Sequence, residues 1–167
     1  MEFKVSFDAY AKVVIAIVTI LFVGIISFHT VQMIESPNRL ARTLAFGFSI
    51  IMMVAIYTFC YLYRPLKYVL ESGKLIVKRP FKDKTIDLSD IRDAYVITKD
   101  SMGWVVKTFG NGGLFGFYGE FRSSRYGHMT WYATRKSNYV MLETTEGRIV
   151  LTPDNLEMAN EIKRQIQ

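Results

Sequence analysis

The sequence predicts two transmembrane helices followed by a β-rich domain of six or seven antiparallel strands, which a C-terminal α-helix closes. Residues 13–34 and 43–63 predict the helices, because both runs are long and contain no Asp, Glu, Lys or Arg. Residues 67–152 predict the strands, because short β-branched and aromatic runs alternate there with turn-forming residues. We therefore expect a membrane hairpin over residues 1–65 and one domain over residues 66–167.

The two apolar runs are long enough to cross a bilayer. At about 1.5 Å rise per residue they span roughly 33 and 31 Å, against a hydrocarbon core of about 30 Å. Glu35 to Arg42 joins them and is too short for anything but a tight reversal. Two alternatives stay open here. One is a cleaved signal peptide, although no small-x-small cleavage site follows the first run. The other is a hairpin buried in a soluble core.

Basic residues around the spans predict that both termini lie in the cytoplasm. The flanks richer in Lys and Arg face the cytoplasm in most membrane proteins. The linking segment carries Arg39 and Arg42. The opposite flanks carry more basic residues, namely Lys4, Lys12, Arg64, Lys67, Lys74, Lys78 and Arg79. Interfacial tyrosines agree with this arrangement, at Tyr10, Tyr57, Tyr61 and Tyr63. Pro65 then ends the second helix.

Turn residues divide the C-terminal region into strands. A Ser72-Gly73 turn predicts a hairpin between the runs KYVLES and KLIVKR. Five further strands are predicted at 85–88, 91–97, 131–135, 138–144 and 148–152.

A C-terminal amphipathic helix follows the last predicted strand. Thr152 is a suitable N-cap, and Pro153 suits the first helical position. Met158, Ile162 and Ile166 recur at a spacing of four residues and predict one apolar face. We expect this helix to lie on the sheet, since it is too short and too charged to cross a membrane.

Four short motifs occur in a fixed order in this region: DLSDI (Asp87–Ile91), GGLFGFYG (Gly112–Gly119), WYATR (Trp131–Arg135) and LTPDN (Leu151–Asn155). With the preceding hairpin of spans, the region from Tyr68 to the end resembles the bacterial pleckstrin-homology (PH) domain proteins. The resemblance implies a PH-like roll, a bent sheet plugged at one end by the C-terminal helix. It also implies a bacterial inner-membrane location for an anchored member, and no defined catalytic activity.

The segment Phe109–Gly127 is unusually rich in glycine and aromatic residues. As a loop it would expose much apolar area, so we expect Phe115, Phe117 and Tyr118 to contact a partner protein, a second copy of the chain or the membrane. The alternative is a loop folded over the end of the barrel, with its aromatic rings in the core. Its glycine spacing does not fit a nucleotide-binding loop, and no helix pattern follows it.

A basic cluster surrounds Pro80-Phe81 and predicts a contact with anionic lipid headgroups. The expected contact residues are Lys78, Arg79, Phe81 and Lys82, with Lys84 beside them. The alternative is a solvated, charged turn. Eukaryotic phosphoinositide-binding PH domains carry their basic residues largely in the first hairpin loop, and here that loop is only Ser72-Gly73.

The remaining residues suggest no enzyme. The two histidines, His29 and His128, fall on opposite sides of the membrane in the predicted topology, and no triad, zinc motif or cofactor motif can be assembled. The single cysteine, Cys60, excludes an intrachain disulfide. The net charge of +6 lies mainly beyond residue 63 and fits a domain beside an anionic leaflet as well as topology bias alone.

We therefore expect a non-enzymatic, membrane-tethered interaction or scaffold domain without cofactor, metal or nucleic-acid partner. Its expected partners are the membrane itself, anionic headgroups, and a protein or a second copy of the chain. The alternative function is an accessory or regulatory subunit of a membrane transporter or envelope-stress complex. In that case the spans themselves would carry the interaction.

Overall fold

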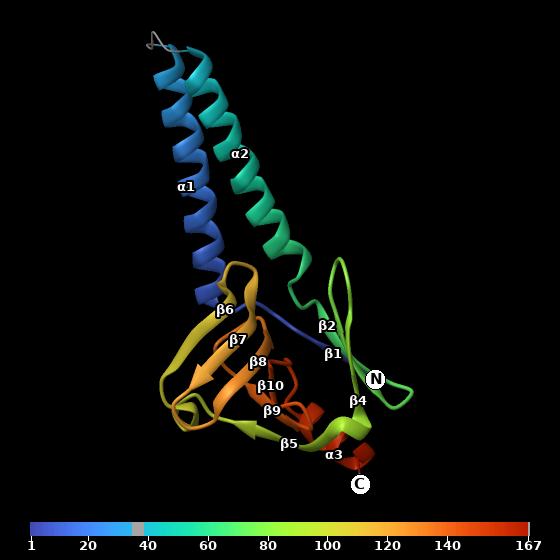
Figure 1. Cartoon of the computed structure of the whole chain (residues 1–167). Helices are drawn as coiled ribbons and strands as arrows, with labels where there is room; N and C mark the ends of the chain where they lie inside the picture. Colours follow the sequence, from blue (N-terminus) through green and yellow to red (C-terminus); the bar gives the residue numbers. More distant parts are fainter. Residues whose placement is uncertain (35–38, 167) are drawn as a thin grey trace.

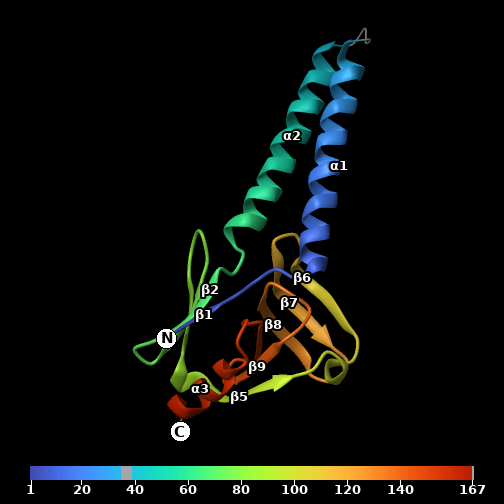
Figure 2. The ribbon, with the colours of Figure 1, turned by 180° about the vertical axis from the view of Figure 1, so that it is seen from behind.

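Two long helices rise from one end of a β-rich domain in the computed structural model, which describes residues 1–34 and 39–166. Helix α1 covers Ala9–Ile34 and helix α2 covers Arg39–Leu62. The two helices converge at their far ends and separate toward the domain (Figures 1 and 2). The predicted reversal at Glu35–Arg42 lies partly outside the described residues, and α2 already begins at Arg39.

Both helices qualify as candidate membrane spans by length and composition. The qualifying segments are Ala9–Val31 and Leu40–Leu62, with mean hydropathies of 2.6 and 2.0, shifted a few residues from the expected bounds. Only 6% of each segment is buried within the molecule, so neither is the core helix of a soluble domain. Exposed apolar surface of this extent is unusual on a soluble monomer. The hairpin could therefore anchor the protein in a membrane.

The N-terminal residues belong structurally to the domain, which the sequence did not suggest. Strand β1 (Glu2–Lys4) pairs antiparallel with β2 (Lys67–Glu71). The sheet continues through β3 (Lys74–Lys78) to β4 (Lys84–Asp87). Cleavage after the first apolar run would remove an edge strand of this sheet, which argues against a signal peptide.

The second sheet has six strands among the described residues and contains the one parallel pair recorded there. Its spatial order is β5-β9-β10-β8-β7-β6, and β8 and β10 run parallel while the other neighbours are antiparallel. The strand bounds are β5 Ile91–Ile97, β6 Val105–Gly113, β7 Gly116–Ser123, β8 Gly127–Ala133, β9 Tyr139–Thr144 and β10 Arg148–Leu151. Two short 3₁₀ turns, η1 (Leu88–Asp90) and η2 (Asp100–Met102), flank β5.

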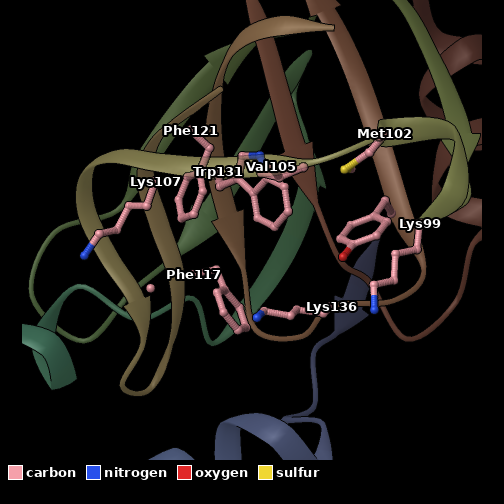
Figure 3. Close-up of a pocket in the computed structure, with 11 residues that line it drawn as sticks. Lys99, Met102, Val105, Lys107, Phe117, Phe121, Trp131 and Lys136 are labelled. Atoms are coloured by element: carbon pink, nitrogen blue, oxygen red, sulfur yellow. The ribbon is translucent and has the colours of Figure 1, made fainter. Parts of the chain in front are cut away.

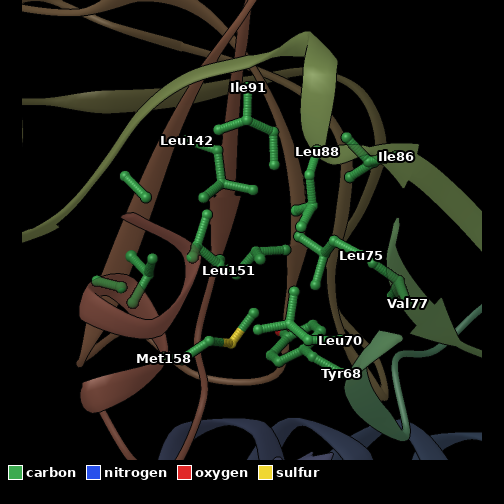
Figure 4. Packing of buried hydrophobic residues seen from close by; sticks show 14 residues of the cluster. Tyr68, Leu70, Leu75, Val77, Ile86, Leu88, Ile91, Leu142, Leu151 and Met158 are labelled. Carbon is green, nitrogen blue, oxygen red and sulfur yellow. The ribbon is translucent and has the colours of Figure 1, made fainter. Parts of the chain in front are cut away.

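Helix α3 (Glu157–Ile166) closes the domain at the end opposite α1 and α2 (Figures 1 and 2). Its residues Met158 and Ile162 are fully buried, as the four-residue spacing predicts. Figure 4 shows Met158 facing a cluster that the four-stranded sheet and the six-stranded sheet share, including Tyr68, Leu75 and Leu151. Two long apolar helices, two sheets and a closing helix confirm the predicted fold class, a helical hairpin followed by a PH-like domain.

The start of α3 differs from the prediction. The helix begins at Glu157, and the Asn155 side-chain oxygen accepts a hydrogen bond from the Glu157 backbone N–H at 2.9 Å. The hydroxyl of Thr152 instead accepts a hydrogen bond from the backbone N–H of Thr134 at 2.9 Å. Asn155 therefore performs the capping role predicted for Thr152.

The glycine-rich segment also differs from the prediction, since it is not a loop. Most of it forms β6 and β7, two paired strands joined by a turn at Leu114-Phe115. The strands approach closely at Gly110 and Gly119, which face each other with φ of +106° and +110°. Glycine tolerates such angles, and its missing Cβ permits the approach. The low strand propensity of glycine concealed this hairpin in the sequence.

Candidate functional site: the helix-proximal face

Two hairpin tips of the domain reach the ends of α1 and α2. One is the β3–β4 turn, residues 79–83, and the other is the β6–β7 turn, residues 113–116. Figures 1 and 2 both show these tips on the side from which the helices leave. Together with the helix ends at Tyr10 and at residues 61–64, we call this the helix-proximal face.

The β6–β7 turn inserts between the two helices. Leu114 and Phe115 are buried in a small cluster with Cys60. Partly buried residues from both helices pack against this cluster, namely Ile15, Val18 and Tyr57. The domain and the hairpin therefore share a small apolar core of their own.

Phe115 is the centre of this contact. Its ring lies edge-on to Tyr57 and Tyr61 of α2, at centroid distances of 4.9 and 5.6 Å. The backbone of Phe115 has φ of +60°, a left-handed conformation that costs a residue with a Cβ about 1 kcal/mol or more. The contacts of the ring with α2 offset this cost.

Tyr118 adds a hydrogen bond to the same helix. Its hydroxyl donates to the backbone carbonyl of Cys60 at 2.8 Å, and both atoms are buried. Cys60 lies in the last turn of α2, where carbonyl groups lack an intrahelical donor. Burial raises the pKa of the Tyr118 hydroxyl, so the donor stays protonated. Tyr118 thus caps the end of α2 from the domain.

Phe117 points to the opposite side of the hairpin and contacts α1. It is 2% exposed, and its ring stacks on that of Tyr10 with the centroids 6.0 Å apart. Phe115, Phe117 and Tyr118 are therefore all buried within the chain, against its helices and its core. The structure gives these three residues an intramolecular partner. A contact with a separate partner through them stays a prediction.

Arg64 joins the two parts of the chain, a role that the sequence analysis missed. Its guanidinium lies over the ring of Tyr61, with the carbon 4.3 Å from the centroid, and within 6 Å of the rings of Phe7 and Phe115 at 5.7 and 5.8 Å. An arginine enclosed by three rings gains cation–π attraction on each. The only signal in the sequence was an arginine between an aromatic-rich span and a proline.

The β3–β4 turn presents an exposed aromatic ring beside the end of α2. Phe81 is 66% exposed, and its backbone N–H donates to the carbonyl of Leu62 at 3.2 Å. Its ring centroid lies 6.1 Å from that of Tyr63. The predicted contact residue Phe81 therefore lies at the level where the candidate span ends.

The basic residues of this turn are not equivalent. Lys78 forms a 2.6 Å ion pair with Asp83, which raises the pKa of Lys78 and lowers the pKa of Asp83. Arg79 donates from Nε to the carbonyl of Lys82 at 2.5 Å, and its guanidinium lies 5.4 Å from the ring of Tyr63. Lys82 and Lys84 have no ion-pair partner among the described residues. Lys82 and Lys84 therefore supply most of the positive charge that is available to bind an anion from outside the protein.

No metal-binding group is present in the described part of the chain, where no three potential ligand side chains gather. His29 lies in α1, whereas His128 lies on β8 with Nε2 3.0 Å from the Glu120 carboxylate. The two histidines are thus in different parts of the molecule.

Comparison with known proteins identifies the family. The sequence pattern described as "Bacterial PH domain" matches residues 66–166, which is more than half of the chain. Comparisons with curated proteins and with solved structures give no match. The matched segment begins at the end of α2 and includes both hairpin tips of the helix-proximal face. The chain belongs to the bacterial PH domain family, with two candidate membrane spans ahead of the matched domain.

Proposed function

We propose that the chain is a non-enzymatic interaction domain held against the cytoplasmic face of a bacterial inner membrane. PH domains are in general non-catalytic interaction modules. In this proposal the division expected from the sequence is kept, with the membrane hairpin in residues 1–65 and the cytoplasmic domain in residues 66–167, except that strand β1 (Glu2–Lys4) joins the domain. Both termini are cytoplasmic.

One observation carries the proposal: the domain is docked on its own helices. Phe115 lies between Tyr57 and Tyr61, Tyr118 caps the end of α2, and only residues 63–66 connect α2 to β2. A domain docked in this way has one face fixed toward the bilayer. Phe81 and Lys82 then stand at the headgroup level, where each basic residue contributes about 1 kcal/mol on an anionic leaflet.

Tethering makes a weak contact sufficient. An attached domain meets the membrane and any other tethered protein at a high effective concentration, so no single contact has to be strong. The cytoplasmic placement follows from the excess of Lys and Arg on the domain side of the two spans.

Hydrogen exchange on the full-length chain in lipid nanodiscs tests the headgroup contact. We expect amides of residues 79–84 to exchange more slowly in nanodiscs containing phosphatidylglycerol than in pure phosphatidylcholine. About 0.5 M salt should remove most of that difference, because the Debye length falls to a few ångströms. The double substitution Lys82→Gln with Lys84→Gln should reduce the difference in exchange between the two lipids.

A control variant lies on β5, at the end of the domain away from the helices (Figure 1). Arg92 and Val96 are both exposed there, and Arg92→Gln with Val96→Ala should leave the lipid-dependent protection unchanged. Equal exchange in both lipids would reject the headgroup contact.

The insertion of the β6–β7 turn between α1 and α2 favours a second candidate, a regulatory subunit that acts through its spans. A change in the spacing of the helices would reach the turn directly through the cluster of Leu114, Phe115 and Cys60. Replacing residues 20–31 and 40–54 by unrelated apolar sequence keeps the docking contacts of Ile15, Val18 and Tyr57 at the domain end. Loss of a co-purifying membrane complex on this replacement would support the subunit function, and its retention would support anchoring alone.

A further inference from the structure

A cavity of about 360 Å³ opens beside the β6–β7 hairpin, on the side opposite Phe115. This volume lies within the range of about 300–1,000 Å³ that is usual for small-molecule sites. Three lysines from separate segments line it, together with aromatic rings from β7 and β8: Lys99, Lys107, Lys136, Phe117, Phe121 and Trp131. Figure 3 shows the lysine side chains arranged around the aromatic rings.

The cavity carries positive charge that the described residues do not neutralise. None of Lys99, Lys107 and Lys136 is in an ion pair with a described carboxylate. The carboxylate of Asp8 also approaches this region, where its two oxygens accept hydrogen bonds from the backbone N–H groups of Ala11 and Lys136, each at 2.8 Å. Its single negative charge offsets only part of the charge of the three lysines. A ligand that enters this cavity therefore meets three ammonium groups, which favours an anion.

The aromatic side of the cavity contains an unpartnered hydrogen-bond donor. Trp131 is 3% exposed, and its indole Nε1 has no acceptor among the described residues. Its ring is fixed by Phe121, 4.7 Å away and stacked, and by Tyr139 at 5.5 Å. A buried donor without an acceptor is unfavourable. The Nε1 atom is itself buried, so what this wall offers a ligand is the apolar surface of the fixed rings.

One edge of the cavity adjoins the start of α1. The Nζ of Lys136 lies 3.9 Å from the ring centroid of Tyr10 and 5.1 Å from that of Phe117. Tyr10 is in the first turn of α1, where the candidate span begins. With α1 in a bilayer, the edge of the cavity formed by Lys136 and Phe117 lies beside the start of the span, so the proposed membrane placement brings this edge to the headgroup level.

We propose that this cavity binds an anionic lipid of the adjoining leaflet. Its acidic headgroup lies among Lys99, Lys107 and Lys136, and the adjoining apolar part lies against Phe117, Phe121 and Trp131. A small soluble anion would use the lysines but not the aromatic wall. This inference rests on the proposed membrane placement of the domain, and it concerns a different surface from the β3–β4 turn.

Quenching of Trp131 fluorescence by brominated lipids tests the proposal on the full-length chain. Trp104, the second tryptophan, is 62% exposed and is replaced by Phe so that Trp131 alone reports. In one series, the protein is placed in phosphatidylcholine nanodiscs that contain increasing fractions of brominated phosphatidylglycerol. In a parallel series, brominated phosphatidylcholine takes the place of the brominated phosphatidylglycerol. We expect saturable quenching by the glycerol lipid and much weaker quenching by the choline lipid at equal bromine content.

Two charge-matched variants locate the effect. Lys99→Gln, Lys107→Gln and Lys136→Gln together should raise the fraction of brominated phosphatidylglycerol needed for half-maximal quenching by about tenfold or more. Lys78→Gln, Lys82→Gln and Lys84→Gln remove the same charge from the β3–β4 turn and the strand ends beside it, and should change this lipid fraction less than about twofold.

Equal quenching by the two brominated lipids in the unsubstituted lysine background would overturn the proposal, as would equal weakening by both triple variants. Displacement of the lipid by inorganic phosphate would also overturn it, in favour of a soluble anion. Lipid-dependent protection of residues 79–84 is a separate measurement. If that protection persists while Trp131 is not quenched, the proposed membrane function stands and the cavity proposal fails.

Discussion

At the residue scale, two tyrosine hydroxyls join distant parts of the chain. Tyr118 donates to Cys60 across 58 residues of sequence. Tyr68 donates to the carbonyl of Tyr132 at 2.5 Å and accepts from the N–H of Thr152 at 3.1 Å. The sequence shows that tyrosines occupy these positions. Their hydrogen-bond partners depend on tertiary contacts, which no local sequence pattern contains.

Removing the Tyr118 hydroxyl should weaken the contact between domain and helix. Tyr118→Phe leaves the Cys60 carbonyl buried without its donor, which costs about 1–3 kcal/mol. We expect a lower unfolding midpoint in detergent for the full-length chain. Tyr95→Phe is the matched control, since it removes a half-buried hydroxyl bonded to Glu143 on the second sheet, away from α2. A midpoint for Tyr118→Phe no lower than that of Tyr95→Phe would contradict the assigned role.

Tyr68 should make the folded domain sensitive to alkali. It is fully buried, and loss of solvation raises its pKa from 10.0 to about 12. Below a pH of about 10 the hydroxyl is neutral in both the folded and the unfolded states, so the stability is complete. Between about 10 and 12 the unfolded state alone releases the proton, and the free energy of unfolding falls by about 1.4 kcal/mol per pH unit.

Chemical denaturation at several pH values measures this slope. Tyr68→Phe should start from a lower stability, because it loses two hydrogen bonds, and should then fall less steeply between about pH 10 and 12. Some slope should remain, since burial also raises the pKa of Tyr95 and Tyr139. Identical slopes in the two proteins would show that Tyr68 is not the group responsible.

At the element scale, the strongest periodic patterns predicted the structure best. Both apolar helices, the first hairpin around Ser72-Gly73 and the apolar face of α3 are confirmed. Strand β1 was missed because it has three residues and forms only by pairing with β2, more than 60 positions away. The β6–β7 hairpin was taken for a loop because glycine is a poor strand former. Its contact with α1 and α2 is a tertiary feature.

Strands β6 and β7 approach so closely at the Gly110–Gly119 pair that neither position should accept a larger side chain. A Cβ on Gly119 would lie 2.5 Å from the carbonyl oxygen of Phe109 and 2.9 Å from the Cα of Gly110, and both atoms belong to the backbone. Its φ of +110° adds strain of about 1–3 kcal/mol for alanine. We expect Gly119→Ala to lower the unfolding midpoint strongly.

Gly47→Ala is the control for that substitution, because a Cβ at Gly47 meets no atom within 4 Å. It lies in the interior of α2, where alanine favours the helix. Its midpoint should be equal to or above that of the unsubstituted chain. If Gly119→Ala behaved in the same way, the description of the hairpin as a tight glycine contact would be wrong.

At the scale of the whole molecule, the hairpin and the domain form one unit. Strand β1, which precedes α1, pairs with β2 in the first sheet, and the β6–β7 turn lies between the helices. Arg64 is enclosed by rings from three segments. Both proposed contacts, the β3–β4 turn and the lysine-lined cavity, depend on this fixed arrangement. A domain free to rotate on its linker would present neither surface to the bilayer steadily.

A distance measurement between helix and domain tests this docking most directly. Spin labels are placed at two exposed positions, Ile51→Cys on α2 and Glu146→Cys in the β9–β10 turn, after Cys60→Ser removes the native thiol. Double electron–electron resonance in nanodiscs should give one narrow distance distribution. Phe115→Ala with Tyr118→Phe should broaden it. A distribution that is already broad in the otherwise unsubstituted chain, and that these two changes leave unaltered, would contradict the docked arrangement.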